Sequence, residues 1–307
     1  MTTPTRPVEP AAVPGGARIL DRGYRRYEGP RTGMKGAVLA VVVSTVQRIL
    51  GLRRSVWAKI LPVLMIVVAY LPAVVFIGIV ALSPNKGIRR REFGELTNIL
   101  PTYSQYFGYI ASAVILFVAF VAPEALCTDR RTGMIGLYLA SPLRRDSYLM
   151  AKTLAVGAVL GAVTIGPPLL LLVAFVLQGN GPDGPFNVVL TLARIVLSGL
   201  AISAFYTALS LAAASLTDRK AFASAGLILA FLVSAAVSGT LISAAGTGQS
   251  AQLVNLFALT FVFVVKVHGE GRFSEVATAP TYAMVAAITL ACAAIVRTRY
   301  QRLQVTR

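Results

Sequence analysis

The sequence has few charged residues and few of the residue types that carry out enzymatic chemistry. Only 13% of its 307 residues are charged, whereas an ordinary soluble domain is about a quarter charged. It holds one histidine, and it lacks the phosphate-binding pattern G-x-x-x-x-G-K-[ST], the zinc pattern H-E-x-x-H and the nucleophile pattern G-x-S-x-G. These absences argue against a soluble enzyme and against a chain that binds ATP by itself.

Cysteine is also scarce. Cys127 and Cys292 lie near the ends of apolar runs, where a reducing cytoplasmic edge favours free thiols over a disulfide. No second histidine or cysteine accompanies His268, so no metal site is predicted.

Hydrophobic residues make up 56% of the chain, and the net charge is +17. The basic residues cluster beside apolar runs, as the positive-inside rule describes for membrane proteins. A nucleic-acid surface would interleave them with aromatic residues. No nucleic-acid partner is therefore expected, whereas contact with membrane lipids is expected.

Six apolar runs are long enough to cross the roughly 30 Å hydrocarbon core as helices. They predict an all-α integral membrane protein whose six-span domain covers residues 60–296. The runs are 60–82, 106–126, 153–177, 188–216, 221–245 and 276–296. A further apolar segment, 251–267, is short enough to be either re-entrant or interfacial on the outer side.

The flanking segments differ from the spans. Residues 1–32 are polar and proline-rich and predict a disordered cytoplasmic tail attracted to anionic headgroups. Residues 33–59 predict an interfacial amphipathic helix, which either anchors the chain or also touches a partner. Residues 297–307 form a basic tail, expected in the cytoplasm.

The distribution of lysine and arginine predicts the orientation. With the N-terminus inside, twenty-two of these residues fall on the inner side and seven on the outer side. This asymmetry predicts cytoplasmic termini in the plasma (inner) membrane, and it requires an even number of spans.

Between the second and third spans lies a charged segment, which we define as the coupling loop, residues 127–152. It is longer than a turn between helices needs to be, and it contains a short amphipathic piece, Met134–Ala140. We expect Asp129, Arg130 and Arg131 to lie in water at the end of the second span. The loop therefore predicts a docking surface.

The run DRRTGMIGLYLASPLRRDSYLMAK resembles the coupling segment of the six-span permeases of ATP-binding-cassette (ABC) exporters, the type-two family. A charged pair and a glycine open a short cytoplasmic helix, a small-Pro-Leu turn follows, and a lysine begins the next span. The matching residues are Asp129, Arg130, Gly133, Leu137, Ser141, Pro142, Leu143 and Lys152. One departure is Thr128, which stands where the family often has an acidic residue, with Glu124 one turn earlier.

The resemblance implies that this segment is a coupling helix seated in a cleft of a separate ABC ATPase. The chain would be an exporter permease subunit, not itself an enzyme. Its partners would be two copies of the ATPase and a second permease chain, as a homodimer or a heterodimer. ATP and magnesium would be bound by the ATPase and no cofactor by this chain. The expected contact residues are Asp129, Arg130, Arg131, Gly133, Leu137, Tyr138, Ser141, Pro142, Leu143 and Arg144.

The substrate is not specified by the sequence, although apolar spans suit a lipid-like or amphipathic cargo. Two charged residues near the spans, Glu124 and Arg194, each have two possible roles. Glu124 either pairs with Arg130 or Arg131 or is wetted by headgroup water. Arg194 either extends its charge to the outer face or contacts an anionic substrate.

Two other classes of function compete. A membrane-embedded enzyme would need convergent carboxylates, histidine or serine within the spans, and the spans offer almost none. A scaffold or assembly protein without transport fits the spans equally well, and only the coupling loop argues against it.

Overall fold

The computed structural model describes residues 33–52, 56–82, 102–140, 143–245, 248–269, 273 and 275–302. Three expectations fall outside these residues: the tail 1–32, the residues Ser141 and Pro142 of the coupling loop, and the last residues of the C-terminal tail, 303–307. All regular elements within the described ranges are helical, which confirms the all-α prediction.

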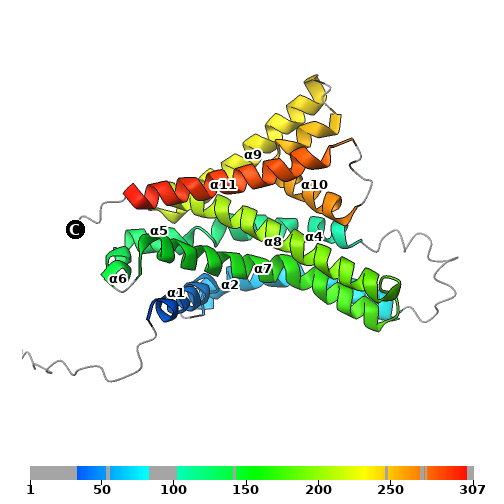
Figure 1. Ribbon diagram of the computed structural model, residues 1–307, viewed down its shortest axis with the longest axis horizontal. Helices are drawn as coiled ribbons and strands as arrows, with labels where there is room; N and C mark the ends of the chain where they lie inside the picture. Colours follow the sequence, from blue (N-terminus) through cyan, green and yellow to red (C-terminus); the bar gives the residue numbers. More distant parts are fainter. Residues whose placement is uncertain are drawn as a thin grey trace, which may run out of the picture. The chain divides into compact units, whose positions relative to one another are not determined.

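The helices run as follows (Figure 1). They are α1 (Gly33–Ile49), α2 (Val56–Leu82), α4 (Tyr103–Phe120), α5 (Glu124–Arg131), α6 (Met134–Ala140), α7 (Arg145–Leu177), α8 (Gly184–Leu216), α9 (Lys220–Ala245), the 3₁₀ helix η2 (Gly248–Leu253), α10 (Leu256–His268) and α11 (Thr278–Arg302).

Six helices, with α4 and α5 counted together, are long and apolar enough to span a membrane. The six-span prediction is therefore confirmed in length and composition. Helix α10 has 13 residues and reaches about 20 Å, which is short of the roughly 30 Å core. It does not add a seventh span.

One end of the bundle gathers the elements of the coupling loop, and we call it the α6 end. Here the Arg145 guanidinium, at the start of α7, donates to the Gln301 carbonyl of α11 at 2.6 Å. Lys220, at the start of α9, lies 2.9 Å from Glu124 of α5. The start of α7, the start of α9 and the C-terminal part of α11 therefore meet here, beside α5 and α6 (Figure 1).

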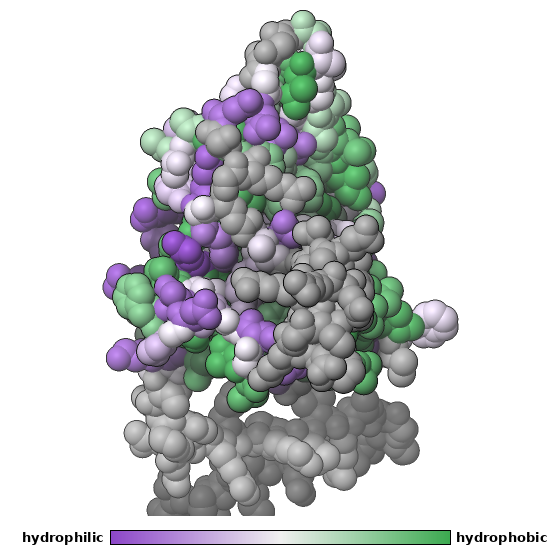
Figure 2. Space-filling model, turned by 90° about the vertical axis from the view of Figure 1, so that its right-hand side faces the viewer, coloured by the Kyte–Doolittle hydropathy of each residue, from purple (hydrophilic) through white to green (hydrophobic). Residues whose placement is uncertain are grey.

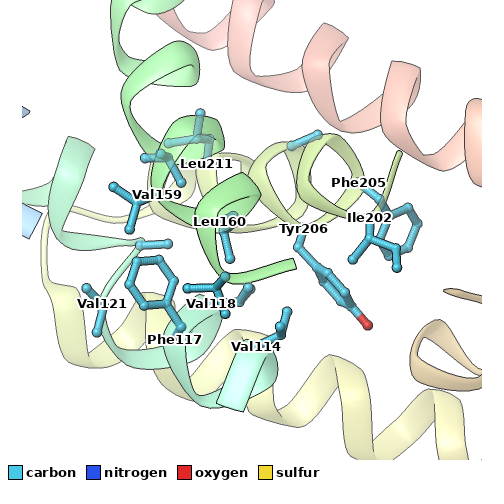
Figure 3. Close-up of a cluster of buried hydrophobic side chains, with 14 of the residues drawn as sticks. Val114, Phe117, Val118, Val121, Val159, Leu160, Ile202, Phe205, Tyr206 and Leu211 are labelled. Carbon is cyan, nitrogen blue, oxygen red and sulfur yellow. The ribbon is translucent and has the colours of Figure 1, made fainter. Parts of the chain in front are cut away.

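The core lies where α4, α7 and α8 pack together (Figure 3). Phe117 of α4, Leu160 of α7 and Phe205 of α8 are at most 1% exposed. Phe117 and Leu160 lie close together, and Phe205 lies further along the same core beside Ile202. These buried apolar contacts fix the helices that carry the charged residues of the α6 end.

The outer surface of the bundle is apolar as well. Only 28% of the most apolar stretch of α2 and 17% of that of α9 is buried, and both stretches consist largely of Val, Leu, Ile and Ala. Figure 2 views the end opposite the α6 end, where hydrophobic residues line the right-hand edge and hydrophilic residues gather over the left half. An apolar exterior of this extent suits lipid contact.

The second span is interrupted. Helix α4 ends at Phe120, and α5 begins at Glu124 after a turn that contains Pro123. Proline has no N–H to donate to the preceding turn, which accounts for a break at this position. After the break the chain continues as α5, whose Asp129 contacts α1 and α7.

The segment 251–267 begins beside the middle of α9. The Leu256 N–H donates to Ser234 Oγ, in the middle of α9, at 3.3 Å. The Asn255 side chain caps α10 by accepting from the N–H groups of Phe257 and Ala258 at 3.0 and 3.2 Å. Helix α10 thus begins beside the middle of α9 rather than beside its end, with its first N–H groups satisfied by Asn255 and Ser234.

We predict that a cysteine at Thr298, on α11 at the α6 end, will react with a membrane-impermeant maleimide from the cytoplasmic side. A cysteine at Asp183, an exposed position between α7 and α8, should react from outside. Neighbouring Gly181 is unsuitable, because its Cβ would lie 2.6 Å from Val176 Cγ2. Native Cys127 and Cys292 are buried, so the wild-type chain is the control. Labelling of both positions from one side would contradict the six-span arrangement.

Candidate functional site

A buried carboxylate lies at the α6 end. Asp129, on α5, is 0% exposed. Its Oδ1 accepts from Nη1 of Arg48 on α1. Its Oδ2 lies 2.6 Å from Nζ of Lys152 and accepts from the Tyr148 hydroxyl of α7 at 2.8 Å. One side chain therefore ties α5 to both α1 and α7.

Lys152 is as deeply buried as Asp129. Its ammonium also donates to Thr45 Oγ1 of α1 at 2.9 Å. It lies 5.7 Å from the ring centroid of Tyr138, on α6, and 5.5 Å from that of Tyr148. We define the buried ion cluster as these residues together: Thr45, Arg48, Asp129, Tyr148 and Lys152.

Helical spacing explains how these side chains converge. Tyr148 and Lys152 are four residues apart on α7, and Thr45 and Arg48 are three apart on α1, so each pair shares one face of its helix. The small residue Ala151, which is fully buried, lies between that pair on α7 and allows α1 to approach closely.

The charges of the cluster are arranged to offset the cost of burial. Two cations face one carboxylate, and the aromatic faces around Lys152 add electrostatic stabilisation. Burial lowers the pKa of Arg48, but the hydrogen bond and the charge of Asp129 outweigh it, so this pKa is raised above its ordinary value. Arg48 is thus held in its charged form, as a buried carboxylate requires.

The expectation that Asp129 lies in water at the end of a span is wrong, since its side chain is fully buried. The reason is that the chain continues as helix α5 after the Pro123 break instead of entering a solvated loop. One face of α5, which includes Ala125, Leu126 and Asp129, is then turned towards the bundle.

Arg130 also makes contacts within the chain. Its guanidinium donates to the Ser215 carbonyl at the end of α8 at 2.5 Å and pairs with Asp218 at 2.8 Å. Glu124 pairs with Lys220 at 2.9 Å, and not with Arg130 or Arg131 as one interpretation held. These contacts join α5 to the turn between α8 and α9.

Fewer of the expected contact residues are exposed than the sequence suggested. Leu137 is 67% exposed, whereas Leu143 is 5% exposed and packs against Val41 and Ala151. Tyr138 is half-buried and directs its ring at Lys152. Leu143 and Tyr138 therefore hold α6 against the bundle within this chain, and a contact of either residue with a partner stays a prediction.

What remains outward is a compact patch on and beside α6, and we call it the exposed α6 surface. It consists of Arg131, Thr132, Gly133, Leu137 and Arg144, all of which are exposed.

Gly133 allows the sharp turn between α5 and α6. Its φ is +68°, in the left-handed region that glycine adopts without steric cost. Just before it, the Thr132 hydroxyl donates to the Thr128 carbonyl at 2.8 Å and closes the last turn of α5. The turn reverses the chain so that Tyr138 comes back over Lys152.

Arg194 makes a contact within the chain. Its Nη1 donates to the carbonyl of His268, the last residue of α10, at 3.1 Å. A cation suits this position because the carbonyls at a helix C-terminus carry partial negative charge. Arg194 therefore fixes α10 to α8.

Three members of the ion cluster, Thr45, Arg48 and Tyr148, were missed in the sequence analysis. The available signal was the spacing of polar residues within apolar helices: Thr45 and Arg48, and Tyr148 and Lys152, each mark one helical face. A paired polar face inside a hydrophobic helix indicates a buried partner of opposite charge.

Among the described residues, no three His, Cys, Asp or Glu side chains are grouped to hold a metal ion. No protein-family model matches the chain, and no curated protein is similar to it.

Proposed function

We propose that the chain is the permease subunit of an ABC exporter and that a separate ATPase docks on the exposed α6 surface. The proposal rests on one observation. A seven-residue helix presents Leu137 outward, while its inner side lies on a buried ion cluster shared by three other helices. Such a helix suits the transfer of force from a partner into the bundle.

The transfer would follow the contacts already described. Movement of α6 acts on Tyr138 and Lys152, and through Asp129 and Arg48 on α7, α5 and α1. Closure of two ATPase subunits on ATP and magnesium would stabilise one arrangement of these helices over another. The spans would then alternate between inward-open and outward-open states.

The finer features of the proposal come from the resemblance. Helix α6 would be the coupling helix, and α1 the interfacial helix at the inner membrane surface. In support, α1 buries Val41, Thr45 and Ile49, which share one helical face. A second permease chain would complete the pore, in the plasma membrane with cytoplasmic termini. A lipid-like or amphipathic substrate suits the apolar spans.

Co-expression with the ABC ATPase encoded nearest to the gene tests the proposal. The ATPase should copurify with this chain, and its ATP hydrolysis should be stimulated by transported substrate. The chain alone should neither bind nor hydrolyse ATP, because its sequence has no phosphate-binding loop.

The outcomes distinguish the alternatives. ATPase that copurifies but never supports transport in proteoliposomes would favour the scaffold interpretation. Saturable ATP binding by this chain alone would contradict the proposal.

A further inference from the structure

A second cluster of positive charge lies at the α6 end, apart from the exposed α6 surface. Arg130, Arg299 and Arg302 line a cavity of about 350 Å³ between the end of α8 and the end of α11, together with Ser215 and Thr298. This volume lies at the lower end of the range of about 300–1,000 Å³ typical of small-molecule sites.

The charge of this cavity is not balanced within the described part of the chain. Asp218 pairs with Arg130, but neither Arg299 nor Arg302 has an acidic partner among the described residues. Three guanidiniums and one carboxylate leave two positive charges in excess. Both arginines of α11 are exposed and can receive an anion.

The arginines supply the hydrogen-bond donors. The Ser215 hydroxyl already donates to the Ala212 carbonyl and the Thr298 hydroxyl to the Ala294 carbonyl. Arg130 is held in place by Ser215 and Asp218 and forms a fixed wall. A ligand that several guanidiniums recognise together is a phosphate group, because the planar fork matches its oxygens in pairs.

The surroundings indicate where this phosphate comes from. Ile295 lies one turn before Arg299 on α11 and is 42% exposed, and Ala291, a further turn along the same face, is exposed as well. Next to Ser215, Leu216 is 58% exposed. An apolar helix surface therefore leads from the arginines along a membrane-spanning helix, as a lipid with its acyl chains beside α11 would require.

We propose that Arg130, Arg299 and Arg302 bind the phosphate of an anionic phospholipid at the α6 end of α8 and α11. The site requires only that these helices span a membrane, so it does not depend on the permease proposal. Occupancy would hold the end of α11 against α8, next to the α5 contacts that Arg130 makes.

The test uses the full chain, purified in detergent and mixed with phosphatidylglycerol or phosphatidylcholine, with bound lipid counted by native mass spectrometry. The wild type should retain phosphatidylglycerol selectively. Arg299→Gln with Arg302→Gln should weaken that binding by about thirty-fold, at about 1 kcal/mol for each arginine near an anionic headgroup. The lysine double variant, Arg299→Lys with Arg302→Lys, should fall between the two, because it keeps charge but loses the fork.

Lys35→Gln with Arg297→Gln is the matched control. It removes two exposed charges from the α6 end outside this cavity, and it should leave binding unchanged. An equal loss in the control, or full binding by the lysine variant, would show diffuse attraction and overturn the proposal. Binding of inorganic phosphate in preference to phosphatidylglycerol would also overturn the proposal. So would a result in which Arg299→Gln with Arg302→Gln keeps phosphatidylglycerol but loses an acidic protein partner.

Discussion

Replacing Asp129 with asparagine should lower the free energy of unfolding by about 3–5 kcal/mol, the usual cost of removing one partner from a buried ion pair. The amide keeps the shape of the side chain but removes its charge. Lys152 is fully buried and would lose its carboxylate at 2.6 Å, and Arg48 would lose its partner as well. A single isosteric change thus leaves two cations uncompensated.

Thermal unfolding of the purified chain in detergent measures this effect. Asp146→Asn is the matched control, because Asp146 pairs with Arg297 at 3.4 Å while both side chains are more than half exposed. Such a pair contributes at most about 1 kcal/mol. Adding Lys152→Met to Asp129→Asn should recover part of the loss. If Asp129→Asn were as mild as Asp146→Asn, the ion cluster would not be a stabilising element.

Combining Arg131→Glu with Leu137→Ala should abolish copurification of the ATPase and transport together, while expression and membrane insertion stay intact. Both side chains are exposed, so the folded chain loses little. At an interface, reversing a paired charge costs about 2–5 kcal/mol, and loss of a central apolar contact adds to it. The binding constant should therefore weaken by at least thirty-fold.

Arg219→Glu with Leu216→Ala is the matched control, with the same two kinds of change at the same end of the bundle but away from the exposed α6 surface. It should leave copurification intact. Tyr138→Ala is a poor alternative, because the Tyr138 ring lies over Lys152 and its removal would disturb the ion cluster. Normal ATPase binding and transport by the first double variant would mean that α6 is not the docking helix.

The fold was largely predictable because length and hydrophobicity decide which segments span a membrane. Five of the expected spans lie within α2, α4–α5, α7, α8 and α9, and the sixth, 276–296, begins two residues before α11. Their ends were less predictable. Helix α7 begins at Arg145 rather than at residue 153, since charged residues at its start find partners: Arg145 bonds to α11 and Lys152 to Asp129.

The site was predicted in position but not in detail. The sequence indicated that the segment around α6 is special, but charge alone does not distinguish a solvated residue from a buried and paired one. Asp129 and Arg131 lie two residues apart, yet the first is fully buried and the second exposed. Residues two apart on a helix lie on nearly opposite faces, and packing against α1 and α7 decides which face of α5 is buried.

The short length of α10 has a consequence for membrane insertion. Where α9 spans a membrane, a helix of 13 residues that starts beside the middle of α9 would have the polar groups of Asn255 and of the η2 backbone at membrane depth. Bare hydrocarbon would not accept them. The Ala251 carbonyl of η2 accepts from Ser238 of α9 at 2.9 Å. Within α10, Thr260 shares a hydrogen bond of 2.9 Å with Tyr206 of α8. The order of assembly follows from this: α8 and α9 enter the bilayer first, and α10 folds into the site that they form.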